Sequence, residues 1–98
     1  MEIKLEKTGA EALITLNGRL DTVTSPELEK LVEEGLDGIT DLTFDCAGVA
    51  YISSAGLRVL LRAEKKMSAC GQMKLKNVSP MIMEIFEITG FSEILTIE

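Results

Sequence analysis

Segments with strand-like and helix-like spacing of apolar residues alternate along this chain, and their order constrains the fold more than any other feature. Apolar residues recur at every second position, as in strands with one buried face, in residues 3–6, 42–46 and 73–76. Residues 12–16 and 94–97 are more continuously apolar and are also predicted to be strands. Helical spacing begins near residues 26, 54 and 80. The resulting order is β-β-α-β-α-β-α-β. Because strands connected through helices are parallel neighbours, we expect an α/β fold with a mostly parallel sheet of four to five strands, an antiparallel N-terminal edge and three helices.

Capping signals mark the starts of the predicted helices. Ser25-Pro26 and Ser79-Pro80 each place a capping hydroxyl before a proline, whose missing N–H costs nothing at the first helical position. A capping box between Thr24 and Glu27 is an alternative start for the first helix. Between the third strand and the second helix, residues 47–52 contain a glycine and are predicted to form a turn-like connection.

The size and charge of the chain exclude several classes of function. At 98 residues the chain forms one domain, residues 1–98. It has no histidine, which excludes Ser-His-Asp catalysis and histidine-ligated zinc. Its net charge of −6 argues against nucleic acid and anionic membranes as partners. No run of 18 apolar residues and no signal peptide is present, so we expect a cytoplasmic protein without membrane insertion.

The two cysteines give no sign of a metal or redox motif. Cys46 and Cys70 stand 24 positions apart and form no CxxC pair. We interpret them as reduced thiols of the core, although the sequence leaves a disulfide open. No metal and no cofactor is expected.

The start of the second helix contains the residues best suited to a functional site. Ser53 and Ser54 stand between a strand-loop unit and a helix. The loops after parallel strands meet at one edge of the sheet, where ligands and partners usually bind. A serine at a helix start is an ordinary cap, and it is also a place where free N–H groups and the helix dipole stabilise a phosphate. Local chemistry alone leaves both roles open.

The sequence resembles the STAS family, named for sulphate transporters and anti-sigma factor antagonists, over essentially its whole length. Stand-alone members have Asp-Ser-Ser-Gly-Leu or Asp-Ser-Thr-Gly-Leu at the helix start and Gly-x-Leu/Ile-Asp after the second strand. The matching residues here are Gly18-Arg19-Leu20-Asp21, Asp45, Gly48, Val49, Tyr51 and Ser53-Ser54-Ala55-Gly56-Leu57. The resemblance implies the STAS fold and a protein-binding switch that is not an enzyme.

The resemblance also implies a partner and a modification. In this family an anti-sigma factor that is a serine/threonine kinase phosphorylates the residue before the motif glycine. The unphosphorylated domain binds that anti-sigma factor and frees sigma, so a phosphatase is a further implied partner. Here Ala55 occupies the acceptor position and Ser53 replaces the Asp. The acceptor is then Ser54, which we favour, or Ser53, or the domain is not phosphorylated.

Two classes of function remain open on these grounds. The leading hypothesis is an anti-sigma factor antagonist whose partner-binding residues are Gly18, Asp21, Tyr51, Ser53, Ser54, Ala55, Gly56, Leu57 and Arg58. The alternative is an unphosphorylated STAS docking subunit of a transporter or signalling scaffold, which Ala55 favours. A nucleotide-binding domain is disfavoured because there is no tryptophan and no phosphate-loop spacing of glycines.

Overall fold

A computed structural model describes residues 1–98 and contains a four-stranded mixed sheet in the order β1-β2-β3-β4. The strands are β1 (Glu2–Thr8), β2 (Glu11–Leu20), β3 (Asp41–Ile52) and β4 (Gln72–Lys76). The helices are α1 (Ser25–Glu34), α2 (Ser54–Ser68), α3 (Pro80–Thr89) and the short 3-10 helix η1 (Phe91–Glu93). β1 pairs antiparallel with β2 and the other pairs are parallel. This arrangement confirms the predicted fold class.

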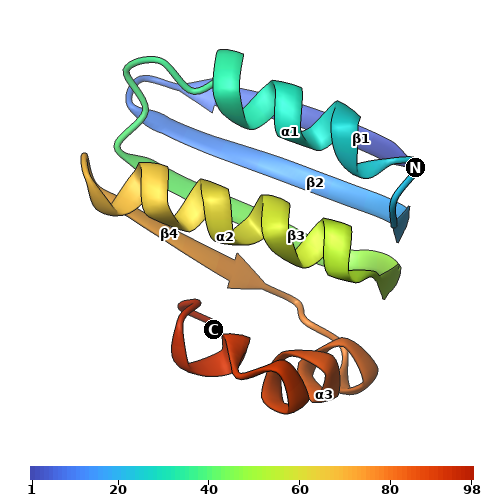
Figure 1. The fold of residues 1–98 in the computed structure, drawn as a ribbon. Helices are drawn as coiled ribbons and strands as arrows, with labels where there is room; N and C mark the ends of the chain where they lie inside the picture. The colour runs from blue at the N-terminus through green and yellow to red at the C-terminus, as the bar shows by residue number, and fades with distance from the viewer.

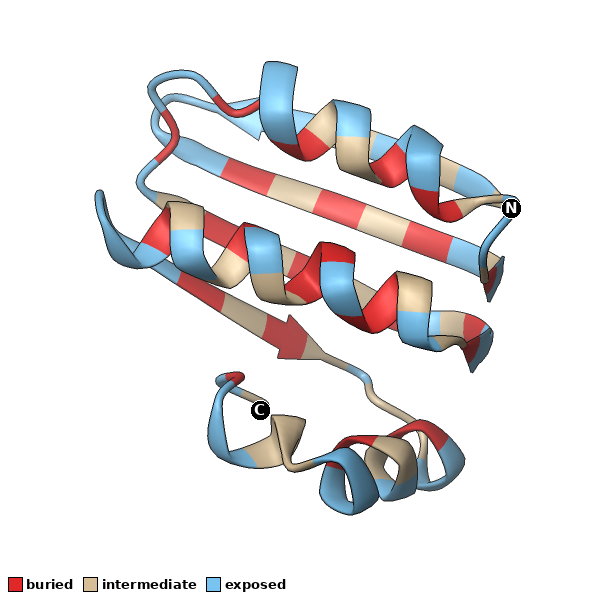
Figure 2. Cartoon of the chain, viewed as in Figure 1, coloured by how far each residue is buried: buried red, intermediate tan, exposed pale blue.

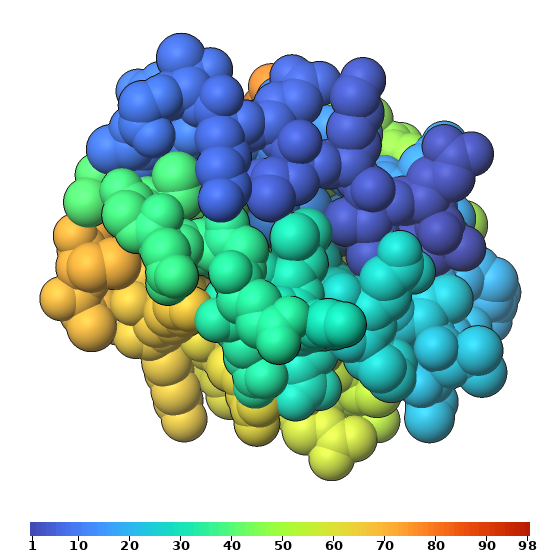
Figure 3. All heavy atoms as spheres, turned by 90° about the horizontal axis from the view of Figure 1, so that it is seen from above, coloured from blue at the N-terminus to red at the C-terminus, as the bar shows by residue number.

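The helices α1 and α2 lie side by side on one face of the sheet (Figure 1). Viewed from above, the blue atoms of β1 lie along one side of the molecule and the teal and yellow atoms of α1 and α2 along the opposite side (Figure 3). Burial alternates along the strands, as expected when one face is covered (Figure 2). The covered face presents fully buried side chains, including Ile14, Leu16, Leu42, Phe44 and Leu75. α3 contacts β3 and contributes Ile82 and Phe86 to the same core.

The prediction of a turn at residues 47–52 was wrong, because β3 continues through them to Ile52. Two register shifts between β2 and β3 occur here, one between Thr15 and Asn17 and one between Gly18 and Arg19. Gly18 then pairs with Val49 and Arg19 with Tyr51. A Cβ at Gly48 would lie 2.4 Å from the Asn17 side-chain oxygen, so glycine permits this close approach. The glycine that suggested a turn therefore belongs to an irregularity within a strand pair, and β2 extends to Leu20.

The predicted fifth strand at residues 94–97 is reduced to a single bridge between Leu75 and Ile97. Gly90 ends α3 in the left-handed conformation, with φ at 81°. η1 follows immediately and uses residues 91–93. Only two backbone hydrogen bonds then join the C-terminus to β4, from Leu75 N to Thr96 O and from Glu98 N to Leu75 O.

All three helices begin within one residue of their predicted starts, and serine caps form at two of them. The hydroxyl of Ser53 accepts from the Gly56 N–H at 3.5 Å, and that of Ser79 accepts from the Ile82 N–H at 3.3 Å. At α1 the cap is Thr24, without a side-chain capping bond, and Ser25 is a buried helical residue. Neither the Ser25 cap nor the capping box forms. The Thr24 hydroxyl instead faces the preceding loop, where it donates to the Arg19 carbonyl at 2.7 Å and accepts from the Asp21 N–H at 2.9 Å.

Both cysteines are free, and their environments differ. Cys46 is buried in the core, as predicted, and burial raises its pKa to about 12. Cys70 is exposed after α2, so its assignment to the core was wrong. None of the helices has both the length and the apolar character needed to span a membrane.

Candidate functional site

The two predicted motifs lie side by side at the carboxyl edge of the sheet. Residues 18–20 end β2 and residues 49–52 end β3, and these segments pair in parallel. The Ser53 N–H donates to the Leu20 carbonyl at 2.9 Å, which ties the start of α2 to the end of β2. The fold therefore brings Gly18–Asp21 and Ser53–Leu57 together, although Asp21 and Ser53 are 32 positions apart in the sequence.

Asp21 organises the loop between β2 and α1. Its Oδ1 accepts the backbone N–H groups of Val23 at 3.0 Å and Thr24 at 3.1 Å. The Thr24 hydroxyl accepts in turn from the Asp21 N–H at 2.9 Å. The hydrogen bond from the Thr24 backbone is the largest cause that lowers the pKa of Asp21. Asp21 thus holds a tight turn whose tip presents Val23, which is 86% exposed.

Arg19 connects Asp21 with Tyr51. Its guanidinium lies 4.6 Å from the centroid of the Tyr51 ring, and its Nε lies 3.8 Å from Asp21 Oδ2. Tyr51 is 39% exposed. Gly18, just before Arg19, has a φ of 113°, a conformation that disfavours any side chain. An aromatic ring, a cation and a carboxylate are thus held together at the protein surface.

The N-terminus of α2 is positively polarised and has no carboxylate to compensate it. Ser53 is half-buried, and its hydroxyl already caps α2 by accepting from the Gly56 N–H. Ser54 is exposed at the first helical position. The first turn contains no acidic residue, and Lys65 and Lys66 stand at the opposite end. Such a helix start stabilises an added negative group.

Gly56 and Leu57 are buried, so they offer no side chain to a partner. A Cβ at Gly56 would lie 2.8 Å from the Leu20 carbonyl oxygen and 3.1 Å from a methyl group of Ile52. The motif glycine therefore lets α2 pack closely on the strand ends. Of the predicted partner-binding residues, these two position the helix, whereas Ser54 and Arg58 are exposed.

Asp45 connects β3 with the end of β4. Its Oδ1 accepts from Asn77 Nδ2 and from the Ala47 N–H, each at 3.1 Å. The Asn77 side chain is the main cause that lowers the pKa of Asp45. Asn77 has a φ of 58°, so Asp45 stabilises a strained turn. No three acidic or cysteine side chains come together as a metal site would need.

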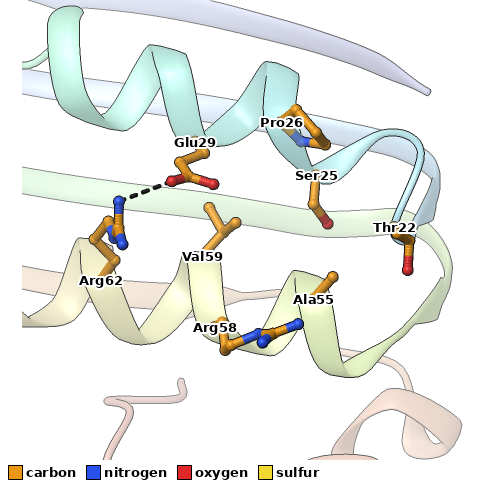
Figure 4. Close-up of a pocket in the computed structure, with 8 residues that line it drawn as sticks. All are labelled: Thr22, Ser25, Pro26, Glu29, Ala55, Arg58, Val59 and Arg62. Atoms are coloured by element: carbon orange, nitrogen blue, oxygen red, sulfur yellow. Dashed lines mark hydrogen bonds and ion pairs between the residues drawn. The ribbon is translucent and has the colours of Figure 1, made fainter.

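A groove of about 280 Å³ lies between the N-terminal halves of α1 and α2 (Figure 4). Ala55, Arg58, Val59 and Arg62 form its α2 wall. Arg62 Nη1 bonds Glu29 Oε1 across it at 2.7 Å and also pairs with Glu33. The remaining lining residues are Thr22, Ser25 and Pro26. The groove adjoins the exposed loop of Val23 and the start of α2.

Comparison with known proteins identifies the family. The protein-family model of the STAS domain matches residues 2–98 of this chain. The chain belongs to the STAS family. This STAS domain is 30% identical over 99 residues to BtrV of Bordetella bronchiseptica, covering 99% of this chain and 85% of BtrV. It is 29% identical to the anti-sigma-B factor antagonist of Bacillus subtilis, covering 99% of this chain and 90% of that protein.

Solved structures share the fold of this STAS domain. An anti-sigma factor antagonist from Mycobacterium paratuberculosis superposes with a TM-score of 0.87 at 21% identity, covering 98% of this chain and 83% of the other. The phosphorylated form of the Bacillus cell fate determinant SpoIIAA superposes with a TM-score of 0.73 at 20% identity. The match covers 99% of this chain and 91% of the SpoIIAA chain. These likenesses show that the chain shares the fold of these structures.

The structure adds residues that the sequence reasoning missed. Arg19 stands inside the Gly18–Asp21 motif, and its contact with Tyr51 depends on the register of β2 and β3. Ser25 and Arg62 come to the site through the packing of α1 on α2, which no local pattern reveals. The sequence does contain one sign that Val23 could contact a partner, since its apolar side chain stands among the polar residues of a turn.

Proposed function

We propose that this STAS domain is an anti-sigma factor antagonist that binds an anti-sigma factor serine kinase and thereby releases sigma. The relatives named as antagonists support this, since the chain aligns with them over nearly its whole length. The observation that carries the proposal is the exposed Ser54 at an uncompensated helix start, on the same edge as Val23 and Tyr51. The function lies in being bound, in the cytoplasm, and the catalytic chemistry belongs to the kinase.

We assign the partner surface to the exposed residues of this edge. Tyr51, Ser54 and Arg58 present side chains to solvent, and Ala55 lines the neighbouring groove. Gly18, Asp21 and Ser53 shape the loop and the helix start that hold this surface. Aromatic residues and arginine are enriched among the residues that dominate binding energy at interfaces.

Ser54 is the proposed phosphate acceptor. Its hydroxyl is on an exposed residue, whereas the Ser53 oxygen already caps the helix. Transfer forms a bond between Ser54 Oγ and the γ-phosphorus of ATP, breaks the bond from that phosphorus to the bridging oxygen, and releases ADP and the hydroxyl proton. The product adds about −1.5 to −2 charges beside the positive end of α2. A charge of this size alters local contacts with a docked protein within about 10 Å.

The test combines mass spectrometry with a binding assay. The protein is incubated with ATP and each candidate anti-sigma kinase from the same genome, and the modified residue is located by fragmentation. We expect one phosphate, on Ser54, and none in Ser54→Ala. A pull-down then compares wild type, Ser54→Asp and Ser54→Ala. Retention of wild type and Ser54→Ala with loss of Ser54→Asp supports the switch, and equal retention of all three removes it.

The docking subunit is the second candidate, because Ala55 stands at the family's acceptor position and cannot accept a phosphate. This candidate predicts a stable complex with a transporter or scaffold protein that is insensitive to kinase and ATP. Neighbouring genes discriminate between the two, since a kinase or phosphatase gene supports switching and transporter subunits support docking.

A further inference from the structure

The groove between α1 and α2 adjoins the proposed partner surface, and its charges indicate what kind of group it receives. Its charged lining residues are Glu29, Arg58 and Arg62. Arg62 is neutralised because it pairs with both Glu29 and Glu33. None of the ion pairs in the structure involves Arg58, which is exposed. The groove therefore presents one cation without a partner.

Ser25 supplies an independent observation that points to a ligand. The residue is only 3% exposed, and its Oγ has no hydrogen-bond partner. Figure 4 shows this oxygen directed from α1 toward the space between the two helices. A buried hydroxyl that forms no hydrogen bond is unfavourable, and proteins rarely leave one without a reason. An acceptor atom from outside would satisfy it.

We propose that this groove is an oxyanion site that receives one carboxylate, from an Asp or Glu side chain of the docked protein. Arg58 provides the guanidinium and Ser25 the inner hydroxyl donor. A carboxylate accepts hydrogen bonds from both groups, and Arg58 is the one cation of the groove that has no ion-pair partner. A volume of about 280 Å³ is enough for such a side chain but small for a nucleotide. The identity of the docked protein as an anti-sigma factor rests on the proposed function, whereas the oxyanion site does not.

The first experiment titrates the isolated protein with sodium acetate, sodium phosphate and sodium chloride at matched ionic strength, followed by ¹⁵N NMR. We expect saturable acetate shifts of the Arg58 side-chain N–H and the Ser25 amide, with none from chloride. Arg58→Gln abolishes these shifts, whereas Lys30→Gln, which removes a charge from the exposed face of α1, leaves them unchanged. Absence of saturation overturns the site, and tighter binding of phosphate than acetate overturns the carboxylate assignment.

Ser25→Ala separates a ligand-binding hydroxyl from a merely unsatisfied one. If Ser25 donates to the ligand, the variant binds acetate at least threefold more weakly while remaining folded by circular dichroism. An unchanged acetate affinity with a raised melting temperature would show that the buried hydroxyl only destabilises the fold. That result would overturn its role as a hydrogen-bond donor to the ligand.

A second arm uses the anti-sigma kinase found in the mass spectrometry experiment. Arg58→Gln is expected to weaken its binding at least tenfold, with Lys30→Gln unchanged. Equal affinity of Arg58→Gln and wild type would contradict the use of the groove by the partner while leaving the proposed function intact. Binding of acetate without any kinase binding would instead contradict the proposed function and leave the oxyanion site standing.

Discussion

The Arg19 guanidinium lies 4.6 Å from the centroid of the Tyr51 ring, and it joins the end of β2 to the end of β3 through side chains as well as through register. Tyr51 belongs to the candidate partner surface, so this contact helps to hold its ring in place. A cation over an aromatic face contributes about 0.5–1 kcal/mol at an exposed position.

Replacing the Tyr51 ring tests this contact. Tyr51→Phe keeps the π face and is expected to leave the free energy of unfolding within about 0.3 kcal/mol of wild type. Tyr51→Leu removes the aromatic ring and is expected to lower the free energy of unfolding by about 0.5–1 kcal/mol. Urea unfolding followed by circular dichroism measures both. Equal stability of the Leu and Phe variants would show that the contact contributes nothing.

Ser53 and Ser54 are expected to differ in their effect on stability. Ser53→Ala removes the cap of α2 and lowers the free energy of unfolding by about 0.5–1 kcal/mol, toward the low end of the usual range because the bond is 3.5 Å long. Ser54→Ala serves as the matched control and changes stability little, since alanine is favourable in a helix. Chemical denaturation compares the two, and a larger loss for Ser54→Ala would contradict the assignment of the cap.

The lowered pKa of Asp21 predicts a pH-dependent contribution to stability. The folded pKa lies below the unfolded one, so the stabilisation is complete above the unfolded value of about 4 and is lost as pH falls through the folded value. Asp21→Asn lacks this contribution. The stability difference between wild type and variant should therefore be largest at pH 6–7 and shrink toward pH 3. Urea titrations at several pH values measure it, and a constant difference would refute the prediction.

The two cysteines are expected to react at very different rates with a thiol reagent. Cys46 is buried with its pKa raised to about 12, so almost no thiolate is present at pH 8, whereas Cys70 is exposed. Intact mass spectrometry after brief labelling should show one adduct, on Cys70, in the native protein and two adducts in 6 M guanidinium chloride. Rapid labelling of Cys46 in the native protein would mean that β3 is not packed as described.

Much of the fold follows from local patterns in the sequence. Apolar alternation located four strands, and the Ser53 and Ser79 caps located two helix starts, because these signals depend on neighbouring residues alone. The errors arose where distant residues decide the structure. Residues 47–52 form a strand because β2 extends beside them. The Thr24 side chain makes no capping bond at α1, and its hydroxyl instead bonds Arg19 and Asp21 in the preceding loop.

The site was predictable in part for the same reason. Motif resemblance placed Gly18–Asp21 and Ser53–Leu57 in one region, and the parallel pairing of β2 and β3 brings them together. Burial separates their roles, since Gly56 packs on Leu20 while Ser54 faces solvent. The groove with Ser25 and Arg62 depends on the packing of α1 on α2, so the sequence alone could not reveal it.

Displacement of sigma from its complex with the anti-sigma kinase tests the central proposal most directly. The preformed complex carries a fluorescent label on sigma, and fluorescence anisotropy follows the addition of wild type, Ser54→Ala or Ser54→Asp. We predict that wild type and Ser54→Ala release sigma in a saturable manner, whereas Ser54→Asp requires at least a tenfold higher concentration. Failure of wild type to release sigma from any candidate complex would contradict the account.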